Sequence, residues 1–338
     1  MYVQPVFKIN WRDKPTGGKP ASLSKGGYTQ DWLINSAFAE PKARPRPTEG
    51  REPCLKREDE MEFYVLLAVL FAALMHASWN AVIRGGGDRF QGMLLLTVTQ
   101  ALMGVLMALF VPLPTGAVWL WVLGSGALHT AYKLFLAAAY QHGDLSRVYP
   151  IARGAAPMMV VVVGFFLLPD TVAFKEYLGI GLIGVGVMMM AQGVFKDGET
   201  RSLIPLALGS AACTAGYSIV DGMGARFAGD ATMFTAWLFI FDGVFFAAFT
   251  SITRGPRVFI ASRRAWSIGA LAGGLSLLTY WIAVWAMTVA PIALVTAVRE
   301  TSVLFAVLIG VFIMKEKASF AKLMAAIVIL FGIVVIRL

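Results

Sequence analysis

Long apolar runs, separated by short polar or charged stretches, recur from residue 63 to the end of the chain. Each run approaches the roughly twenty residues that an α-helix needs to cross about 30 Å of hydrocarbon. The runs do not alternate between apolar and polar positions, as the strands of a membrane β-barrel must. The sequence therefore predicts an all-α polytopic membrane protein with ten transmembrane helices, at about 63–83, 91–112, 117–140, 146–168, 174–194, 203–223, 231–252, 265–288, 291–314 and 318–337.

The ten predicted helices form two groups of five. When the chain is shifted by 146 residues, positions 149–191 fall on 295–337 without a gap, so that Arg153 meets Arg299. Because five is an odd number, the second group enters the membrane from the opposite side, and the two repeats have inverted topology. We expect a first repeat over residues 61–195 and a second over 200–338.

Residues 1–60 have a different composition, rich in proline, glycine and both signs of charge. They contain no apolar core that would make a signal peptide, and their acidic residues argue against a transit peptide. Such a segment is typical of a disordered tail. Alternatively, translation starts at Met61, directly before the first apolar run, and we favour this start.

Composition and charge agree with a membrane protein. The chain is 58% hydrophobic and 14% charged, whereas a soluble domain carries about 25% charged residues. The net charge of +9 comes from the tail and from helix ends, so it does not indicate nucleic-acid binding. Basic residues concentrate in the loops after the odd-numbered helices, which places those loops in the cytoplasm and both termini outside.

Cofactor and enzyme signatures are missing from the sequence. Cys54 and Cys213 are the only cysteines, and they make neither a disulfide framework nor a zinc site. The chain has no phosphate-binding loop, no H-E-x-x-H motif and no nucleophile elbow. We therefore expect no cofactor, no metal and no enzymatic activity.

Several stretches resemble a known family. They are HASWNAVIRGG at 76–86, YQHGDLSRVYPIARGAAP at 140–157, and the acidic residues Asp170 and Glu316 in the loops after the fourth and ninth helices. With its two inverted groups of five helices, the region 63–338 resembles the EamA family of the drug/metabolite transporter superfamily. The resemblance implies a secondary carrier that hydrolyses no ATP. Members of the family usually have a basic loop between the second and third helices and cytoplasmic ends. Here that loop, VPLPTG, carries no charge, and the basic residues lie instead in the loop between the seventh and eighth helices.

Ionisable residues inside the predicted helices are the candidate functional residues, because each costs at least ~2.5 kcal/mol to place in hydrocarbon. Arg153 and Arg299 descend from opposite faces and would flank a central cavity, unless they reach back to the interface. Lys133 either meets an anionic ligand or pairs with Asp242 or Glu300, and such a pair could also serve packing alone.

Other polar and aromatic residues could line the same cavity. His76 and Asn80 share a helix face, and His129 lies one turn before Lys133. A histidine can bind a proton near neutral pH, although a hydrogen-bonded packing role is the alternative. Asp221, near a predicted helix end, is expected at the interface. We predict substrate contacts by Lys133, Arg153, Arg299, Tyr132, Tyr149, Trp79, Asn80 and Tyr280, and proton coupling by Glu300, His76, Asp242 or His129.

Small residues and prolines mark two further positions. The stretch GIGLIGVG at 179–186, the glycine face, is typical of close helix packing and could also form a homodimer contact. Pro150 and Pro157 lie within the fourth predicted helix, where they either break the helix along a transport pathway or only kink it.

These features favour a secondary transporter. It would move a small organic metabolite, anionic or zwitterionic, across the bacterial inner membrane by alternating access, with the solute and the lipid bilayer as its partners and no nucleic acid. Two alternatives remain at this stage. One is a non-transporting membrane scaffold or accessory protein, in which the buried charges form internal ion pairs. The other is a passive facilitator without proton coupling.

Overall fold

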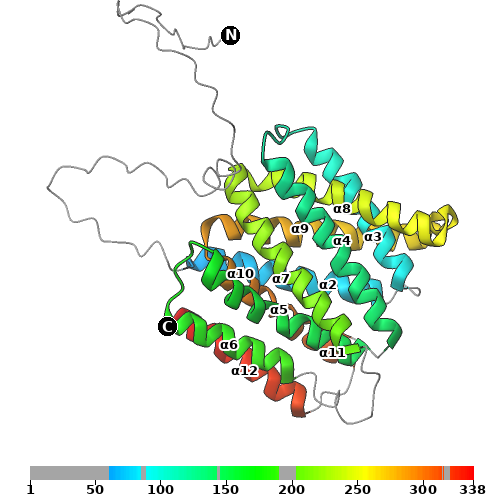
Figure 1. The fold of residues 1–338 in the computed structure, drawn as a ribbon. Helices are drawn as coiled ribbons and strands as arrows, with labels where there is room; N and C mark the ends of the chain where they lie inside the picture. Colours follow the sequence, from blue (N-terminus) through cyan, green and yellow to red (C-terminus); the bar gives the residue numbers. More distant parts are fainter. Residues whose placement is uncertain (1–60, 85–88, 143–144, 190–202, 314, 316–319) are drawn as a thin grey trace, which may run out of the picture. The chain divides into compact units, whose positions relative to one another are not determined.

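The computed structural model describes residues 61–84, 89–142, 145–189, 203–313, 315 and 320–338, so the predicted tail lies outside it. The described residues form α-helices and one short 3-10 helix, with no strand among them (Figure 1). In chain order the helices are α2 (Phe63–Arg84), α3 (Arg89–Ala108), α4 (Val118–His142), α5 (Leu145–Leu167), α6 (Phe174–Met189), α7 (Leu203–Ala228), α8 (Ala231–Arg254), η1 (Pro256–Phe259), α9 (Arg263–Val289), α10 (Ile292–Arg299), α11 (Ser302–Phe312) and α12 (Phe320–Arg337).

Each predicted apolar segment contains helix, which confirms the all-α prediction for the described residues. Two shorter apolar stretches are Ala152–Leu167 and Leu323–Arg337. The total of ten membrane crossings therefore stays a prediction. Among the described residues, six helical stretches are able to cross a membrane by length and composition: Phe63–Ile83, Phe90–Ala108, Leu203–Ala228, Ala231–Arg254, Arg263–Val289 and Ile292–Phe312.

Apolar side chains cover the outside of the helix bundle, and charged side chains lie inside it. Phe110 is 88% exposed and Phe166 is 77% exposed, whereas Lys133 is 6% exposed and Arg299 is 2% exposed. A soluble protein shows the reverse, because lysine and arginine are rarely buried in water-soluble folds. This distribution fits a bundle surrounded by lipid, in which ionisable groups face the interior.

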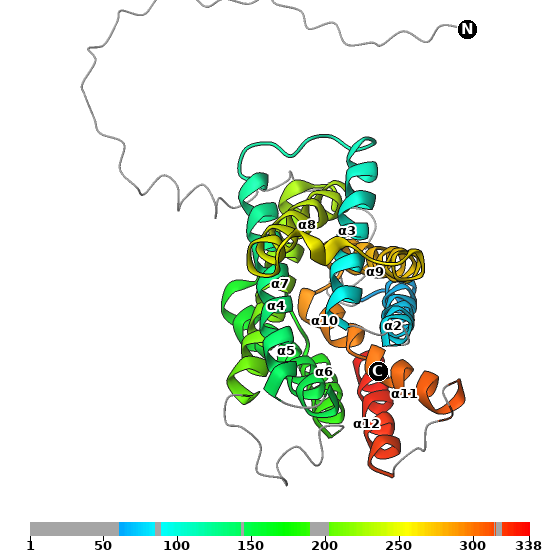
Figure 2. The same cartoon turned by 90° about the vertical axis from the view of Figure 1, so that its right-hand side faces the viewer.

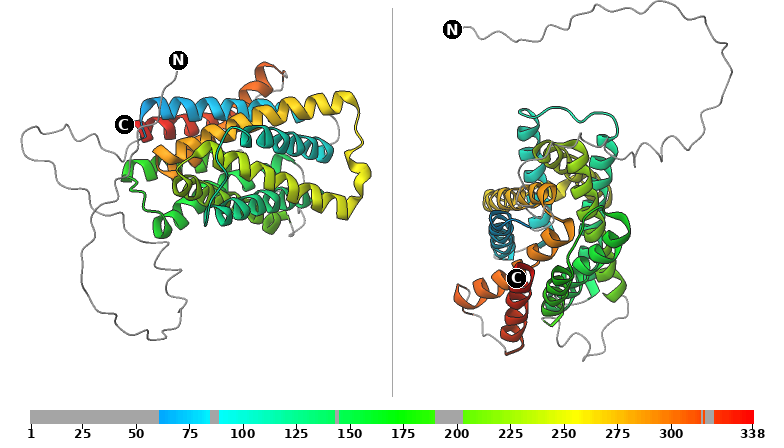
Figure 3. Two further views of the ribbon diagram at one scale, coloured as in Figure 1. Left: turned by 90° about the horizontal axis from the view of Figure 1, so that it is seen from above. Right: turned by 90° about the vertical axis from the view of Figure 1, so that its left-hand side faces the viewer.

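The helices of the two repeats contact each other in matched pairs. The contact of α2 with α9 has its counterpart in α7 with α4, and the contact of α2 with α11 has its counterpart in α7 with α5. Figure 3 shows α2 (blue) beside α9 (yellow to orange). Helices α3 and α8 pair with each other, as do α6 and α12 (Figure 2). Exchange of the two repeats therefore leaves the main contact pattern unchanged.

The glycine face packs within the chain, where it lets α6 approach α12 closely. A Cβ atom at Gly179 would lie 2.4 Å from Cγ1 of Ile336, and one at Gly186 would lie 2.6 Å from Cγ1 of Ile329. Because later residues of α6 meet earlier residues of α12, the two helices run antiparallel. A Cβ atom at Gly181 would meet no atom of another described helix within 4 Å. Close helix packing thus uses most of this face, and a homodimer stays a prediction.

The ninth apolar segment is divided by a tight turn between α10 and α11, where the chain changes direction (Figure 2). The backbone N–H groups of Glu300 and Thr301 donate to the carbonyls of Ala297 and Val298, each at 3.0 Å. These i→i−3 bonds belong to a 3-10 turn, and such a turn inside a helix often marks a functional hinge. The fourth segment contains Pro150 and Pro157, the predicted sites of a break or kink, and it forms the continuous helix α5.

A polar network joins the two repeats outside the helix centres. Arg226, at the end of α7, pairs with Asp170 through Nη1–Oδ1 at 2.5 Å and Nη2–Oδ2 at 3.2 Å. It also donates to the carbonyls of Met287 at 2.7 Å and Ala290 at 2.9 Å. Asp170 accepts a further bond from the amide of Ile292 at 2.8 Å. The acidic residue after the fourth segment therefore holds the α9–α10 connection against α7.

Candidate functional site

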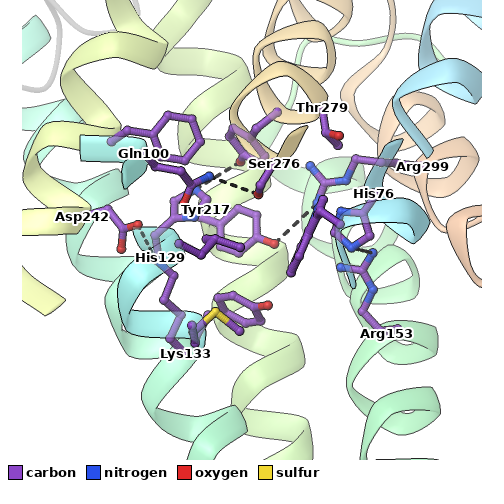
Figure 4. A pocket seen from close by; sticks show the side chains of 16 residues that line it. His76, Gln100, His129, Lys133, Arg153, Tyr217, Asp242, Ser276, Thr279 and Arg299 are labelled. Carbon is purple, nitrogen blue, oxygen red and sulfur yellow. Dashed lines mark hydrogen bonds and ion pairs between the residues drawn. The ribbon is translucent and has the colours of Figure 1, made fainter. Parts of the chain in front are cut away.

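A cavity of ≈ 50 Å³ lies between α2, α3, α4, α5, α7, α8, α9 and α10. About 10–15 Å³ suffices for one water molecule, so the cavity has room for a few waters. Most metabolite sites are larger, at about 300–1,000 Å³. Its lining residues, drawn in Figure 4, are His76, Trp79, Met93, Leu96, Gln100, His129, Tyr132, Lys133, Arg153, Tyr217, Phe239, Asp242, Ser276, Thr279, Tyr280 and Arg299.

Lys133 on α4 forms a buried ion pair with Asp242 on α8. Its ammonium group also donates to Oγ1 of Thr97 at 2.9 Å, and Thr130 donates to Oδ1 of Asp242 at 3.2 Å. A buried pair of this kind needs such additional bonds to offset its loss of hydration. Of the two predicted partners for Lys133, the structure selects Asp242. The lysine therefore lines the cavity with its charge already balanced.

Arg153 on α5 lies between a histidine and a carboxylate. Its Nε atom is 2.9 Å from Oε2 of Glu300, in the turn between α10 and α11. Its Nη2 atom donates to Nε2 of His76 at 3.1 Å and to Oγ of Ser302 at 3.4 Å. Because the arginine can only donate, Nε2 of His76 acts as the acceptor and carries no proton. Two predicted coupling residues, His76 and Glu300, thus contact the same arginine, which lines the cavity. Figure 4 shows His76 beside Arg153.

Arg299 differs from the other two buried cations. It is 2% exposed and lines the cavity from the last turn of α10. Nη2 donates to the hydroxyl of Tyr217 at 3.4 Å, and the guanidinium carbon lies 5.2 Å from the ring centre of Tyr280. Within the described residues, Nε and Nη1 of Arg299 have no hydrogen-bond partner. Trp79 also lines the cavity, and its indole N–H likewise has no hydrogen-bond partner among the described residues.

Asp221 on α7 makes a third polar cluster, with His129 on α4 and Tyr280 on α9. Its Oδ2 atom accepts a hydrogen bond from the Tyr280 hydroxyl and lies 3.0 Å from Nε2 of His129. Asp221 is 0% exposed, so its carboxylate lies inside the bundle, and its predicted depth at the membrane interface stays a prediction. The predicted helix stopped at residue 223, whereas α7 continues to Ala228. The longer helix places its end about 7.5 Å further from Asp221, at 1.5 Å per residue.

The remaining residues predicted to contact the substrate differ in whether they line the cavity. Tyr132 and Tyr280 line the cavity. Asn80 does not line it, and its amide donates to the carbonyl of His76 at 2.8 Å. Tyr149 lies on α5, but its side chain is outside the described part of the structure. The assignment of substrate contacts and coupling groups stays a prediction for all of these residues.

Several cavity residues had not been predicted as site residues. Tyr217 lies one turn before Asp221 on α7 and stacks on His129, with ring centres 4.0 Å apart. Gln100 donates to Oγ of Ser276 at 3.1 Å across the cavity. The spacing of Tyr217 and Asp221, four residues apart on one helix face, is the signal that could have revealed this cluster. Among the described residues, no group of His, Cys, Asp and Glu is arranged to hold a metal ion.

Two comparisons with known proteins find matches. The model of the EamA-like transporter family matches residues 63–192 and again residues 201–338. A solved structure described as "Crystal structure of protein" has a TM-score of 0.66 and 20% sequence identity, over 81% of this chain and 98% of that chain. It is one of 29 solved chains that match, and at this identity the likeness shows the fold alone. No curated protein matches this sequence.

Proposed function

The chain belongs to the EamA-like transporter family, as its motifs predicted, and we propose that it is a secondary transporter for a small organic solute with an anionic group. The solute would bind in the central cavity, and the protein would expose that cavity alternately to the two sides of a bacterial inner membrane. Members of the family are transporters, and the apolar surface of the bundle fits a multi-pass membrane protein.

The guanidinium group of Arg299 is the observation that carries the proposal. A buried arginine without a carboxylate in direct contact is costly in a membrane protein. Lys133 and Arg153 are neutralised by Asp242 and Glu300, whereas Arg299 presents to the cavity N–H groups that have no partner in the described part of the chain. An anionic group on the solute would accept these hydrogen bonds and offset the buried charge.

Two features of the fold support alternating access. The cavity of ≈ 50 Å³ holds a few waters, so a metabolite can bind only if helices around it move. The matched contacts between the repeats, together with the antiparallel pairing of α6 with its counterpart α12, support an inverted pair of repeats. In such a carrier the same sequence pattern can close either side of a central site.

A thermal-shift screen of the purified protein against organic acids and amino acids should identify the solute. Uptake into proteoliposomes then tests transport, and Arg299→Ala should weaken solute binding at least tenfold, because a hydrogen bond to a charged group contributes about 1.5–3 kcal/mol. Arg257→Ala is the matched control, since Arg257 is exposed in η1. Solute binding that is unchanged in Arg299→Ala would refute the assigned site.

The scaffold alternative makes a different prediction. If the ion pairs only stabilise the bundle, no solute should protect the protein against heat, and proteoliposomes should show no flux above empty vesicles. Flux without any response to a pH gradient would instead favour a passive facilitator.

A further inference from the structure

We propose that Asp221, His129 and Tyr280 form a proton-binding site that couples proton movement to transport of the anionic solute. The inference rests on the proposed function, and it names the proton gradient as the source of energy for transport. The three residues come from α7, α4 and α9. They meet at Oδ2 of Asp221, which accepts from the Tyr280 hydroxyl and lies 3.0 Å from Nε2 of His129. Nε2 and the Tyr280 hydroxyl are 3.2 Å apart.

The Asp221 carboxylate has a position for one more proton. It is 0% exposed, and its Oδ1 atom has no hydrogen-bond partner among the described residues. An ionised carboxylate with an unpartnered oxygen in the interior is costly, and a proton removes this cost. The imidazole of His129 lies within hydrogen-bond distance of the carboxylate, with Nε2 3.0 Å from Oδ2.

Protons can reach this site from the cavity. His129 and Tyr280 line the cavity, whereas Asp221 lies behind them. A proton from cavity water binds to an unprotonated nitrogen of His129, and from Nε2 it can pass to Oδ2 of Asp221. The site then holds one additional proton and one additional positive charge, and Tyr280 remains a neutral phenol. Release into the cavity is the reverse step.

The charged groups around the site favour coupling to an anion. Tyr217 stacks on His129, and Phe239 of α8 lies near the same ring. Neither aromatic side chain brings a charge to the site. Lys133, one turn along α4, is balanced by Asp242. Arg299 is the cation directed toward the site, because its guanidinium lies 5.2 Å from the ring centre of Tyr280. This positive charge opposes proton binding.

An anionic solute on Arg299 would cancel that charge and make proton uptake more favourable. By the reciprocity of linked equilibria, a bound proton would then strengthen binding of the anion by the same factor. Proton and solute would therefore load together and leave together. Each event alone leaves a buried charge unbalanced, so the two partly loaded states are disfavoured.

The other predicted coupling residues fit a proton site less well. Asp242 accepts bonds from both Lys133 and Thr130. Glu300 is paired with Arg153, and His76 already accepts a bond from that arginine. A proton on any of these groups would break a contact with a fixed cation or lie next to one.

Infrared difference spectra of the protein in nanodiscs, recorded between pH 8 and pH 5, test the proton site without any solute. We expect a protonated-carboxyl band that disappears in Asp221→Asn. Asp230→Asn is the matched control, because Asp230 caps α8 by accepting bonds from the amides of Thr232 and Met233, and asparagine caps equally well. A carboxyl band that persists in Asp221→Asn would overturn the proposal.

Tyr280→Phe provides a second variant that keeps the ring. It removes one donor from the ionised carboxylate, so it should raise the proton affinity of the site about tenfold, since about 1.4 kcal/mol corresponds to one pH unit. An unchanged band midpoint would contradict the role given to Tyr280.

Flux measurements separate this inference from the proposed function. With the solute found by thermal shift, Asp221→Asn should keep solute exchange in proteoliposomes but lose the response to an imposed pH gradient. A full gradient response in Asp221→Asn would refute the coupling. If the infrared band depends on Asp221 but no solute crosses the membrane, the proton site stands and the proposed transport fails.

Discussion

Asp242→Ala should destabilise the protein strongly, because it leaves the buried ammonium group of Lys133 with a single hydroxyl partner. In the native protein this group contacts the Asp242 carboxylate and donates to Oγ1 of Thr97 at 2.9 Å. The two charged side chains are 6% and 1% exposed, so solvent screens their interaction little. The substitution therefore removes the neighbouring charge and leaves one neutral acceptor.

The magnitude follows from what remains buried. Removal of one member of a buried ion pair costs about 3–5 kcal/mol, and an uncompensated lysine in a membrane span costs about 2.5–3.5 kcal/mol. We therefore expect a loss of about 3 kcal/mol, roughly a hundredfold in the folding equilibrium. The double variant Lys133→Met/Asp242→Leu should recover most of this loss, because apolar residues of similar volume can replace a buried pair at little cost.

Unfolding in detergent of the native protein, Lys133→Met, Asp242→Leu and the double variant measures the coupling between the two residues as a double-mutant cycle, and Asp242→Ala is unfolded alongside them. A double variant as unstable as Asp242→Ala would refute the reasoning, since the cost would then not come from an uncompensated charge. Solute binding by the double variant would show that Lys133 acts through packing. Loss of binding in a stable double variant would instead support the predicted contact between Lys133 and the solute.

Further predictions concern the guanidinium site, the α6–α12 contact and the network outside the cavity. Arg299→Lys should keep the charge but weaken solute binding about tenfold in a thermal-shift titration, because lysine lacks the planar, forked donors of arginine. Gly179→Leu should lower the unfolding temperature, since its Cβ would lie 2.4 Å from α12, whereas Gly181→Leu faces open space and should not. Arg226→Gln should speed hydrogen exchange at the start of α10 about tenfold, because it removes the ion pair that holds Asp170 beneath that amide.

The position of each helix could be predicted from the sequence because runs of twenty apolar residues have few other stable structures in lipid. The break in the ninth segment could not. Its sequence contains no proline or glycine between Arg299 and Ser302, and within the 3-10 turn Glu300 contacts Arg153 of a distant segment. The fourth segment shows the converse, because α5 remains one helix although it contains Pro150 and Pro157.

The types of residue in the site could be predicted, but their pairing could not. Glu300 follows Arg299 in the sequence, and it was predicted as a possible partner of Lys133. In the structure Glu300 pairs with Arg153 of the other repeat. Successive residues of a helix point about 100° apart, and neighbours in the sequence therefore face different helices. Pairing depends on which helices lie side by side, and one sequence does not contain that information.

The balance of charge in the bundle connects the two proposals. Two of the cations that line the cavity have a carboxylate in direct contact, as Lys133 has Asp242 and Arg153 has Glu300. Arg299 and Asp221 do not form such a contact among the described residues, and Tyr280 lies between them, with its ring against one and its hydroxyl on the other. Two buried opposite charges that do not contact each other lower the stability of the fold. They are suited to a solute that brings an anion to Arg299 while a proton neutralises Asp221.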